Sequence, residues 1–155
     1  MRNYWLSLIL LLAIPGCVAS EPESSEVAAV PDDPGIPAER AAATEAANRF
    51  LARIDKGEIS EVWPELSVVM TESVRRSDWE RSIAAMRQDI GNIEVRRLTK
   101  IGFTDGLGDI PKGRYYILHF VSDFDRATVT EELTVSLENG LWRVGGYFAS
   151  DIKLK

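Results

Sequence analysis

The sequence predicts an α+β domain in which N-terminal helices pack on one face of a four-stranded antiparallel sheet. Apolar residues recur at three- and four-residue spacing in the segments 37–57 and 77–91, which is the period of an amphipathic helix. Strand-like runs follow after residue 93, and the last three are joined by short connections, so they form an antiparallel meander. Helices that precede a block of strands are typical of the α+β class.

The first helix is predicted to begin at Pro37, whose fixed φ suits the first helical position, and to end at Gly57. The second long helix is predicted to begin at a capping box, in which Ser77 and Glu80 satisfy each other's backbone N–H groups, and to end at Gly91. Two shorter segments between these helices also have helical character, residues 59–63, stopped by Pro64, and residues 65–74.

The strongest turn signal is Asn139-Gly140, because a type I′ turn needs positive φ at both central residues. A two-residue turn also fixes the register of its hairpin. The facing pairs are then Glu138 with Leu141, Leu137 with Trp142, Val135 with Val144, Leu133 with Gly146, and Glu131 with Phe148. All but the first pair share one face, which is apolar except for Glu131 and the gap at Gly146. The two earlier strands are predicted over residues 93–103 and 113–124.

Composition restricts the possible chemistry. The net charge of -6 argues against nonspecific binding to nucleic acid or to anionic membrane surfaces. Cys17 is the single cysteine and His119 the single histidine, so the sequence excludes an intramolecular disulfide and a Cys/His metal cluster. No nucleophile elbow, phosphate loop or zinc motif is present, and we predict no cofactor. His119 is predicted to be partly exposed and without a partner, rather than a general base.

The first 17 residues have the form of a signal peptide. A short positive start precedes the apolar run Tyr4–Ile14, which is too short to span a bilayer comfortably. The run ends in Ile14-Pro15-Gly16-Cys17, which resembles a bacterial lipobox, and the resemblance implies that Cys17 is lipidated. Two alternatives stay open, ordinary signal cleavage after Ala19 and an uncleaved anchor.

Residues 18–37 are predicted to be a disordered tether, because they are acidic and proline-rich and contain no basic residue. The folded domain is then expected over residues 38–155. The lipobox resemblance implies a lipid anchor in the bacterial cell envelope with the domain facing the periplasm. Val18 follows the cysteine where an Asp would retain a lipoprotein at the inner membrane, so the outer membrane is favoured.

Several stretches carry a family resemblance. They are residues 50–57 (Phe-Leu-Ala-Arg-Ile-Asp-Lys-Gly), Val62-Trp63, Ser77-Asp78-Trp79, residues 113–116 (Gly-Arg-Tyr-Tyr) and residues 140–148 (Gly-Leu-Trp-Arg-Val-Gly-Gly-Tyr-Phe). Together they resemble the bacterial family called domain of unknown function 4019. The resemblance implies a cystatin-like fold, similar to the nuclear transport factor two superfamily, with a curved sheet wrapped around helices. It also implies export, but it supplies no activity and no catalytic residue.

Glu131 is the most informative polar position, because it lies on an otherwise apolar strand face. A buried, unpaired carboxylate would cost several kcal/mol. Glu131 is therefore expected either to form an ion pair with Arg96 or Arg97, or to face a pocket at the gap left by Gly146. The candidate pocket residues are Glu131, Trp142, Gly146, Tyr147 and Phe148.

Two classes of function follow from these features. The first is an envelope lipoprotein whose domain is a binding or interaction module for a small apolar or amphipathic molecule, or for another envelope protein. The second is a small pocket enzyme in which Glu131 transfers a proton. An open cavity with Glu131 pointing into it, free of arginine, would favour the enzyme.

Overall fold

The computed structural model describes residues 29–106, 108 and 110–155, and the predicted lipidation site at Cys17 lies outside them. The helices are α1 (Pro37–Asp55), α2 (Ile59–Val62), α3 (Val68–Ser73) and α4 (Arg76–Ile90), with a 3₁₀ turn at Trp63–Glu65. The strands are β1 (Ile93–Thr104), β2 (Tyr115–Phe124), β3 (Ala127–Glu138) and β4 (Leu141–Leu154).

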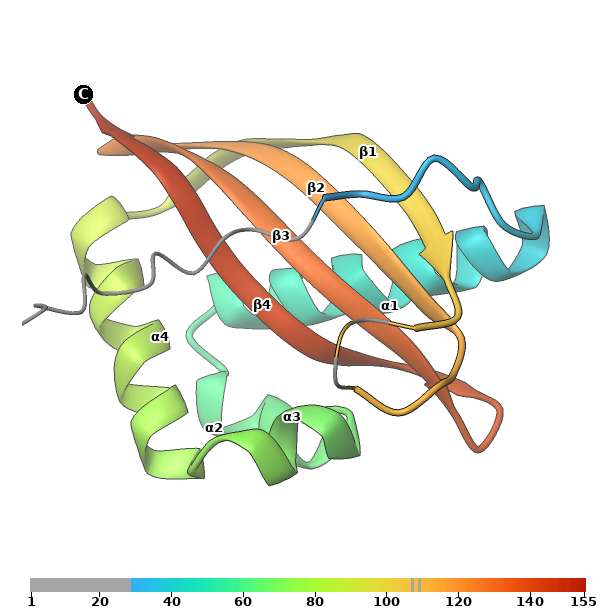
Figure 1. The fold of residues 1–155 in the computed structure, drawn as a ribbon. Helices are drawn as coiled ribbons and strands as arrows, with labels where there is room; N and C mark the ends of the chain where they lie inside the picture. The colour runs from blue at the N-terminus through green and yellow to red at the C-terminus, as the bar shows by residue number, and fades with distance from the viewer. Residues whose placement is uncertain (1–28, 107, 109) are drawn as a thin grey trace, which may run out of the picture.

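The strands form one antiparallel sheet in the order β1-β2-β3-β4, which confirms the α+β class and the meander. The helices lie on one side of this sheet, and α1 runs behind the strands in Figure 1. The main core lies between them, because buried residues of α1, such as Phe50 and Leu51, join Leu118 of β2 and Leu133 of β3 in one cluster.

Helix α1 begins and packs as its sequence predicts. Pro37 occupies the first turn, and the helix ends at Asp55, two residues before Gly57 with its φ of 81°. The buried side of α1 is formed by Ala43, Ala46, Ala47, Phe50, Leu51 and Ile54. Its small alanines allow the helix to lie close to the sheet, and burial of its larger side chains stabilises the fold by about 1.5–3 kcal/mol each.

The start of α4 differs from the prediction. The helix begins at Arg76, one residue before the expected cap, and its N-cap residue Arg75 makes no side-chain capping bond. Glu80 accepts a hydrogen bond from Arg76 Nε over 2.7 Å instead of reaching back to the backbone of Ser77. The ion pair with Arg76 has replaced the capping box. The predicted end is confirmed, because Gly91 caps the helix with a φ of 85°.

The Asn139-Gly140 turn is confirmed, with φ values of 50° and 79°. The β2–β3 pair runs without interruption, whereas the β1–β2 and β3–β4 pairs carry register shifts. One shift on β4 lies between Val144 and Gly146, which pair with the consecutive β3 residues Val135 and Thr134. Gly145 is therefore an extra residue in β4, a β-bulge.

Part of the predicted tether lies against the sheet. Val30 is buried, and the carbonyl of Asp33 accepts a hydrogen bond of 2.7 Å from the backbone N–H of Phe103 in β1. The carbonyl of Pro31 lies so close to Gly102 that a side chain at that position would collide with it. The described part of this segment, residues 29–36, passes over the end of β1 (Figure 1).

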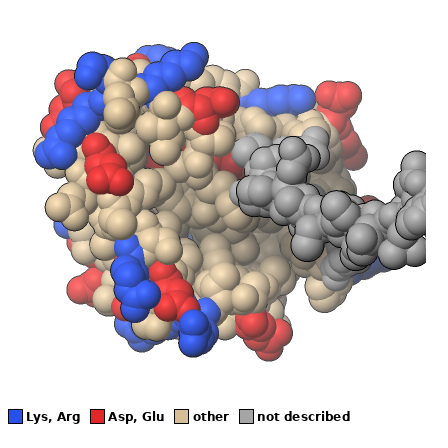
Figure 2. Space-filling model, turned by 60° about the vertical axis from the view of Figure 1, so that its left-hand side comes forward, with Lys and Arg blue, Asp and Glu red and all other residues tan. Residues whose placement is uncertain are grey.

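Charged side chains of both signs mix over the surface that Figure 2 shows. Lys and Arg side chains stand beside Asp and Glu side chains at the margins of this face, around a hollowed, uncharged centre. Such mixing is what a solvated surface with several exposed ion pairs produces.

Candidate functional site

Glu131 lies at the centre of a buried hydrogen-bond network. It stands on the face of β3 that packs against the helices, and its side chain has no solvent exposure. Arg96 Nε of β1 donates to Glu131 Oε2 over 2.6 Å, and the Ser122 hydroxyl of β2 donates to the same oxygen. Of the two partners that the sequence offers, Arg96 forms the ion pair, whereas Arg97 pairs with Asp123.

Two further charges complete the network. Asp55, the last residue of α1, accepts two hydrogen bonds from Arg96, over 2.7 and 3.1 Å. Arg87 of α4 lies between the acids, with Nη2 at 3.2 Å from Glu131 Oε1 and Nη1 at 3.0 Å from Asp55 Oδ1. Two guanidinium groups therefore face two carboxylates, and the charges cancel. We call Asp55, Arg87, Arg96 and Glu131 the charge cluster.

Tyr147 closes the network from β4. Its hydroxyl accepts a hydrogen bond from Arg87 Nη2 over 2.9 Å and donates one to Glu131 Oε1 over 2.5 Å. The predicted register was wrong at this point, because it placed Tyr147 on the opposite face. The bulge at Gly145 shifts the pairing, so Leu133 faces Tyr147 and Glu131 faces Ala149. A shift of one residue exchanges the two faces of a strand.

The electrostatics of the network keep Glu131 and Arg96 ionised. Burial alone would raise the pKa of the Glu131 carboxyl, but the charges of Arg96 and Arg87 outweigh burial and lower that pKa below its usual range. Burial opposes the charge on Arg96, yet hydrogen bonds to Asp55 and the charge of Glu131 raise its pKa above the usual value. Burial and the Glu131 carboxylate together raise the pKa of Tyr147 well above its usual value, so this hydroxyl keeps its proton.

Sequence reasoning missed Asp55 and Arg87. A signal for Arg87 was present, because it lies four residues after Ile83 and three before Ile90, both of which are buried on α4. A charged residue at such a position points toward the core. Asp55 gave no comparable signal, since the end of a helix is an ordinary place for an acidic residue.

His119 also differs from its prediction. It lies on the outer face of the sheet, and its Nε2 is 2.9 Å from Oε2 of Glu132, its direct neighbour on β3. The prediction of a histidine without a partner was wrong, because the sequence did not reveal that two outward-facing residues would stand side by side. Glu132 is buried, so this pair belongs to the covered part of the outer face.

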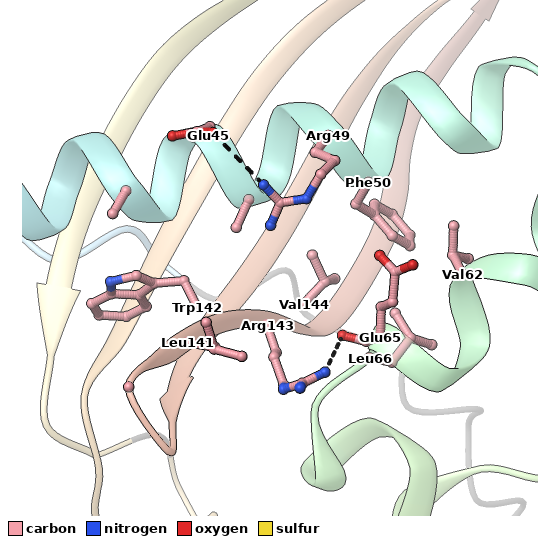
Figure 3. Close-up of a pocket in the computed structure, with 13 residues that line it drawn as sticks. Glu45, Arg49, Phe50, Val62, Glu65, Leu66, Leu141, Trp142, Arg143 and Val144 are labelled. Atoms are coloured by element: carbon pink, nitrogen blue, oxygen red, sulfur yellow. Dashed lines mark hydrogen bonds and ion pairs between the residues drawn. The ribbon is translucent and has the colours of Figure 1, made fainter.

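A cavity lies between α1, the segment after α2, and the start of β4. We call it the α1–β4 cavity, and its volume is about 380 Å³. Its apolar lining consists of Ala42, Ala46, Phe50, Val62, Leu66, Leu141, Trp142 and Val144. Charged side chains at its mouth are Glu45, Arg49, Glu65 and Arg143 (Figure 3). This volume, together with an apolar wall and charged groups that could orient a ligand, lies in the range of small-molecule sites.

The five candidate pocket residues separate in the structure. Trp142 lines the α1–β4 cavity, where its ring also packs against Tyr116 at a centroid distance of 5.2 Å. Glu131 belongs to the charge cluster and Tyr147 hydrogen-bonds to it, and both are absent from the lining of this cavity. Phe148 lies on the outer face and is 51% exposed, and a Cβ atom on Gly146 would contact its ring. The gap at Gly146 therefore opens no space beside Glu131.

A second cavity of about 350 Å³ lies at the rim of the charge cluster. Asp55 and Arg87 contribute to its wall, together with Arg126, whose Nη1 donates to the Gln88 carbonyl over 2.8 Å. Glu131 is not part of this wall. In the described ranges, no three His, Cys, Asp or Glu side chains gather closely enough to hold a metal ion, and no helix is long and apolar enough to cross a membrane.

Comparisons with known proteins agree with the family resemblance. Residues 46–147 match the family described as "Protein of unknown function (DUF4019)", and they include most of α1, all of β1 to β3, and the bulged part of β4. No curated protein and no solved structure matches the chain. Because the match covers well over half of the sequence, the chain belongs to the DUF4019 family.

Proposed function

We propose that this chain is a lipid-anchored protein of the bacterial cell envelope whose domain binds a small apolar or amphipathic molecule. The observation that carries the binding function is the α1–β4 cavity, with its apolar wall and its charged mouth. A protein-interaction module is the other form of the same class. A concave site fits a compact ligand better than it fits the flat surface of a partner protein. The cavity therefore supports a small-molecule ligand over a protein partner.

The geometry gives less support to an enzyme that uses Glu131. A general base must reach the proton it removes, directly or through one water. Both oxygens of Glu131 already accept hydrogen bonds, Oε2 from Arg96 and Oε1 from Tyr147. The side chain is fully buried and its pKa is lowered, so it has neither access to a substrate nor a tendency to take up a proton near neutral pH.

The binding function is tested by blocking the cavity. Ala42 lines its mouth and is exposed, so Ala42→Trp should fill the opening without disturbing the core. Nile red, a neutral fluorescent probe for apolar sites, should bind the wild-type domain and bind Ala42→Trp roughly tenfold more weakly or worse. Ala52→Trp is the matched control, because Ala52 is exposed on the same helix but outside the cavity.

Two results would contradict the binding function. One is the absence of Nile red binding to a wild-type domain that melts cooperatively. The other is equal binding by Ala42→Trp and Ala52→Trp, which would place the probe elsewhere on the surface.

The anchor is tested separately through Cys17, which the lipobox resemblance implies is acylated. The wild-type protein should fractionate with membranes, and Cys17→Ser should be released or accumulate as an unprocessed precursor. Two or three acyl chains, each contributing about 0.8 kcal/mol per buried methylene, make such an attachment effectively permanent. A mature protein that starts at Ser20 and carries no lipid, as measured by intact mass, would contradict the anchor.

A further inference from the structure

The mouth of the α1–β4 cavity holds a guanidinium group that no carboxylate of the described residues neutralises. Arg143 projects from β4 toward the segment after α2, and its Nη1 donates to the Glu65 carbonyl over 3.1 Å (Figure 3). This is the single hydrogen bond that its side chain makes within the part of the chain that the structure describes, although a guanidinium has five N–H donors. No described carboxylate lies within ion-pair distance of Arg143.

The acidic groups nearby are engaged by other arginines. The Glu65 carboxylate, which also lies at the mouth, is bound by Arg53 Nη1 over 2.5 Å. Glu45 pairs with Arg49 one turn along α1, but the distance is 3.8 Å and both side chains are largely exposed. An exposed pair of this kind is weak, so Arg49 is available to a stronger anion. Two arginines from α1 and β4 therefore border one opening.

The wall behind these arginines is apolar. Phe50 and Leu66 are buried, and Trp142, which also lines the cavity, is half-buried. Leu141, at the tip of the hairpin, is 58% exposed and extends the apolar surface to the mouth. A ligand that fits both regions needs an apolar body and one negatively charged end.

We propose that the α1–β4 cavity binds a fatty-acid-type ligand, a single acyl chain that ends in a carboxylate. This inference rests on the proposed function and names its ligand class. The carboxylate pairs with Arg143, whose planar fork matches its two oxygens, and Arg49 adds a second positive charge. The acyl chain lies against Phe50, Leu66 and Trp142, where each buried methylene tightens binding about fourfold until the cavity is full.

The test compares decanoate with decanol, which share an acyl chain and differ in charge. Both are titrated as competitors of Nile red on the wild-type domain, below their aggregation concentrations. Decanoate should bind roughly tenfold more tightly than decanol, the gain expected of one charge-assisted contact. Arg143→Gln should remove this preference and leave decanol binding unchanged.

Arg81→Gln is the matched control, because it removes the same charge from an exposed position on α4 that is outside the cavity. It should keep the preference for decanoate. Thermal melts of both variants exclude a general loss of structure, since neither arginine is buried.

The possible failures are distinguishable. Equal binding of decanoate and decanol, or an unchanged preference in Arg143→Gln, would overturn the carboxylate site while Nile red binding still supports a cavity for apolar molecules. Tighter binding of decyl phosphate than of decanoate would overturn the carboxylate assignment in favour of a phosphate head group. Absence of Nile red binding would overturn both the ligand class and the proposed function.

Discussion

Tyr147 donates a hydrogen bond of 2.5 Å to Glu131, although uninterrupted strand pairing would place these residues on opposite faces of the sheet. The extra residue Gly145 brings them together, because it shifts the register of β4 by one position. A Cβ atom at Gly145 would lie only 3.3 Å from Ser67, the N-cap residue of α3. The bulge at Gly145 thus contributes to two features at once, because it brings Tyr147 to Glu131 and leaves room for the N-terminus of α3.

Glu131→Gln is expected to destabilise the domain by about 3–5 kcal/mol at neutral pH, because it leaves a buried positive charge uncompensated. Arg96 would keep one acidic partner, Asp55, and Arg87 would share it. Urea unfolding followed by tryptophan fluorescence measures the change. Glu45→Gln is the control, because Glu45 is highly exposed and its loss should change stability by less than about 1 kcal/mol. A Glu131→Gln domain as stable as wild type would show that the charge of Glu131 makes no net contribution to the free energy of unfolding.

The stability of the wild-type domain should depend on Glu131 at acidic pH in a defined direction. Its pKa in the folded state is lowered, so the stabilisation is complete above the unfolded-state value of about 4.3 and is lost as the pH falls through the folded-state value. The difference in free energy of unfolding between wild type and Glu131→Gln should therefore narrow below about pH 4. A difference that stays constant from neutral to acidic pH would contradict the lowered pKa.

Tyr147→Phe should lower the free energy of unfolding by about 1.5–3 kcal/mol, which is the usual contribution of a hydrogen bond to a charged group. The substitution removes the hydroxyl that makes the shortest hydrogen bond to Oε1 of Glu131. Tyr115→Phe is a matched comparison, since the Tyr115 hydroxyl donates to the uncharged Pro111 carbonyl over 2.7 Å. Its loss should cost about 0.5–1.5 kcal/mol. Chemical denaturation of both variants measures the difference, and the reverse ranking would show that the Tyr147 hydroxyl is not a significant partner of the cluster.

Replacing Asn139-Gly140 by Ala-Ala should destabilise the hairpin by about 1–2 kcal/mol for each position, because alanine is strained at positive φ. The melting temperature should fall while Nile red binding per folded molecule stays close to wild type, since Gly140 contributes no side chain to the cavity that it borders. Asn48→Ala, at an exposed position inside α1, is the control and should be neutral or slightly stabilising. A melting temperature of the Ala-Ala variant equal to that of wild type would contradict the type I′ turn.

Local signals in the sequence predicted the elements of the fold well. Pro37, Gly91 and Asn139-Gly140 each act through their own backbone preferences, and each occupies the predicted place in the structure. The pairing of Glu131 with an arginine was also predictable, because a buried carboxylate needs a partner and the first strand offers the adjacent candidates Arg96 and Arg97.

The bulge and the cavity were not predictable in the same way. Gly145-Gly146 offers two adjacent positions at which an extra residue fits equally well by backbone preference, so the local sequence does not select Gly145, the residue that lies beside Ser67 in the fold. Asp55 joins Arg87 and Arg96 through the relative placement of two helices and a strand, which no local pattern encodes. The α1–β4 cavity is lined by residues of α1, the segment after α2 and β4, which are distant in the sequence, so no local pattern predicts it.

The irregular pairing of the outer strands has a consequence for self-association. β1 and β4 are the two edge strands of the sheet, and both carry register shifts, while the inner β2–β3 pair is regular. A free edge that is long and flat is a template for adding strands of another molecule, and a bulge twists it out of that shape. Gly145 interrupts the first half of β4, and Asp151, with a φ of 48°, disturbs the strand again. The same residue that places Tyr147 beside Glu131 therefore also makes this edge a poor seed for aggregation.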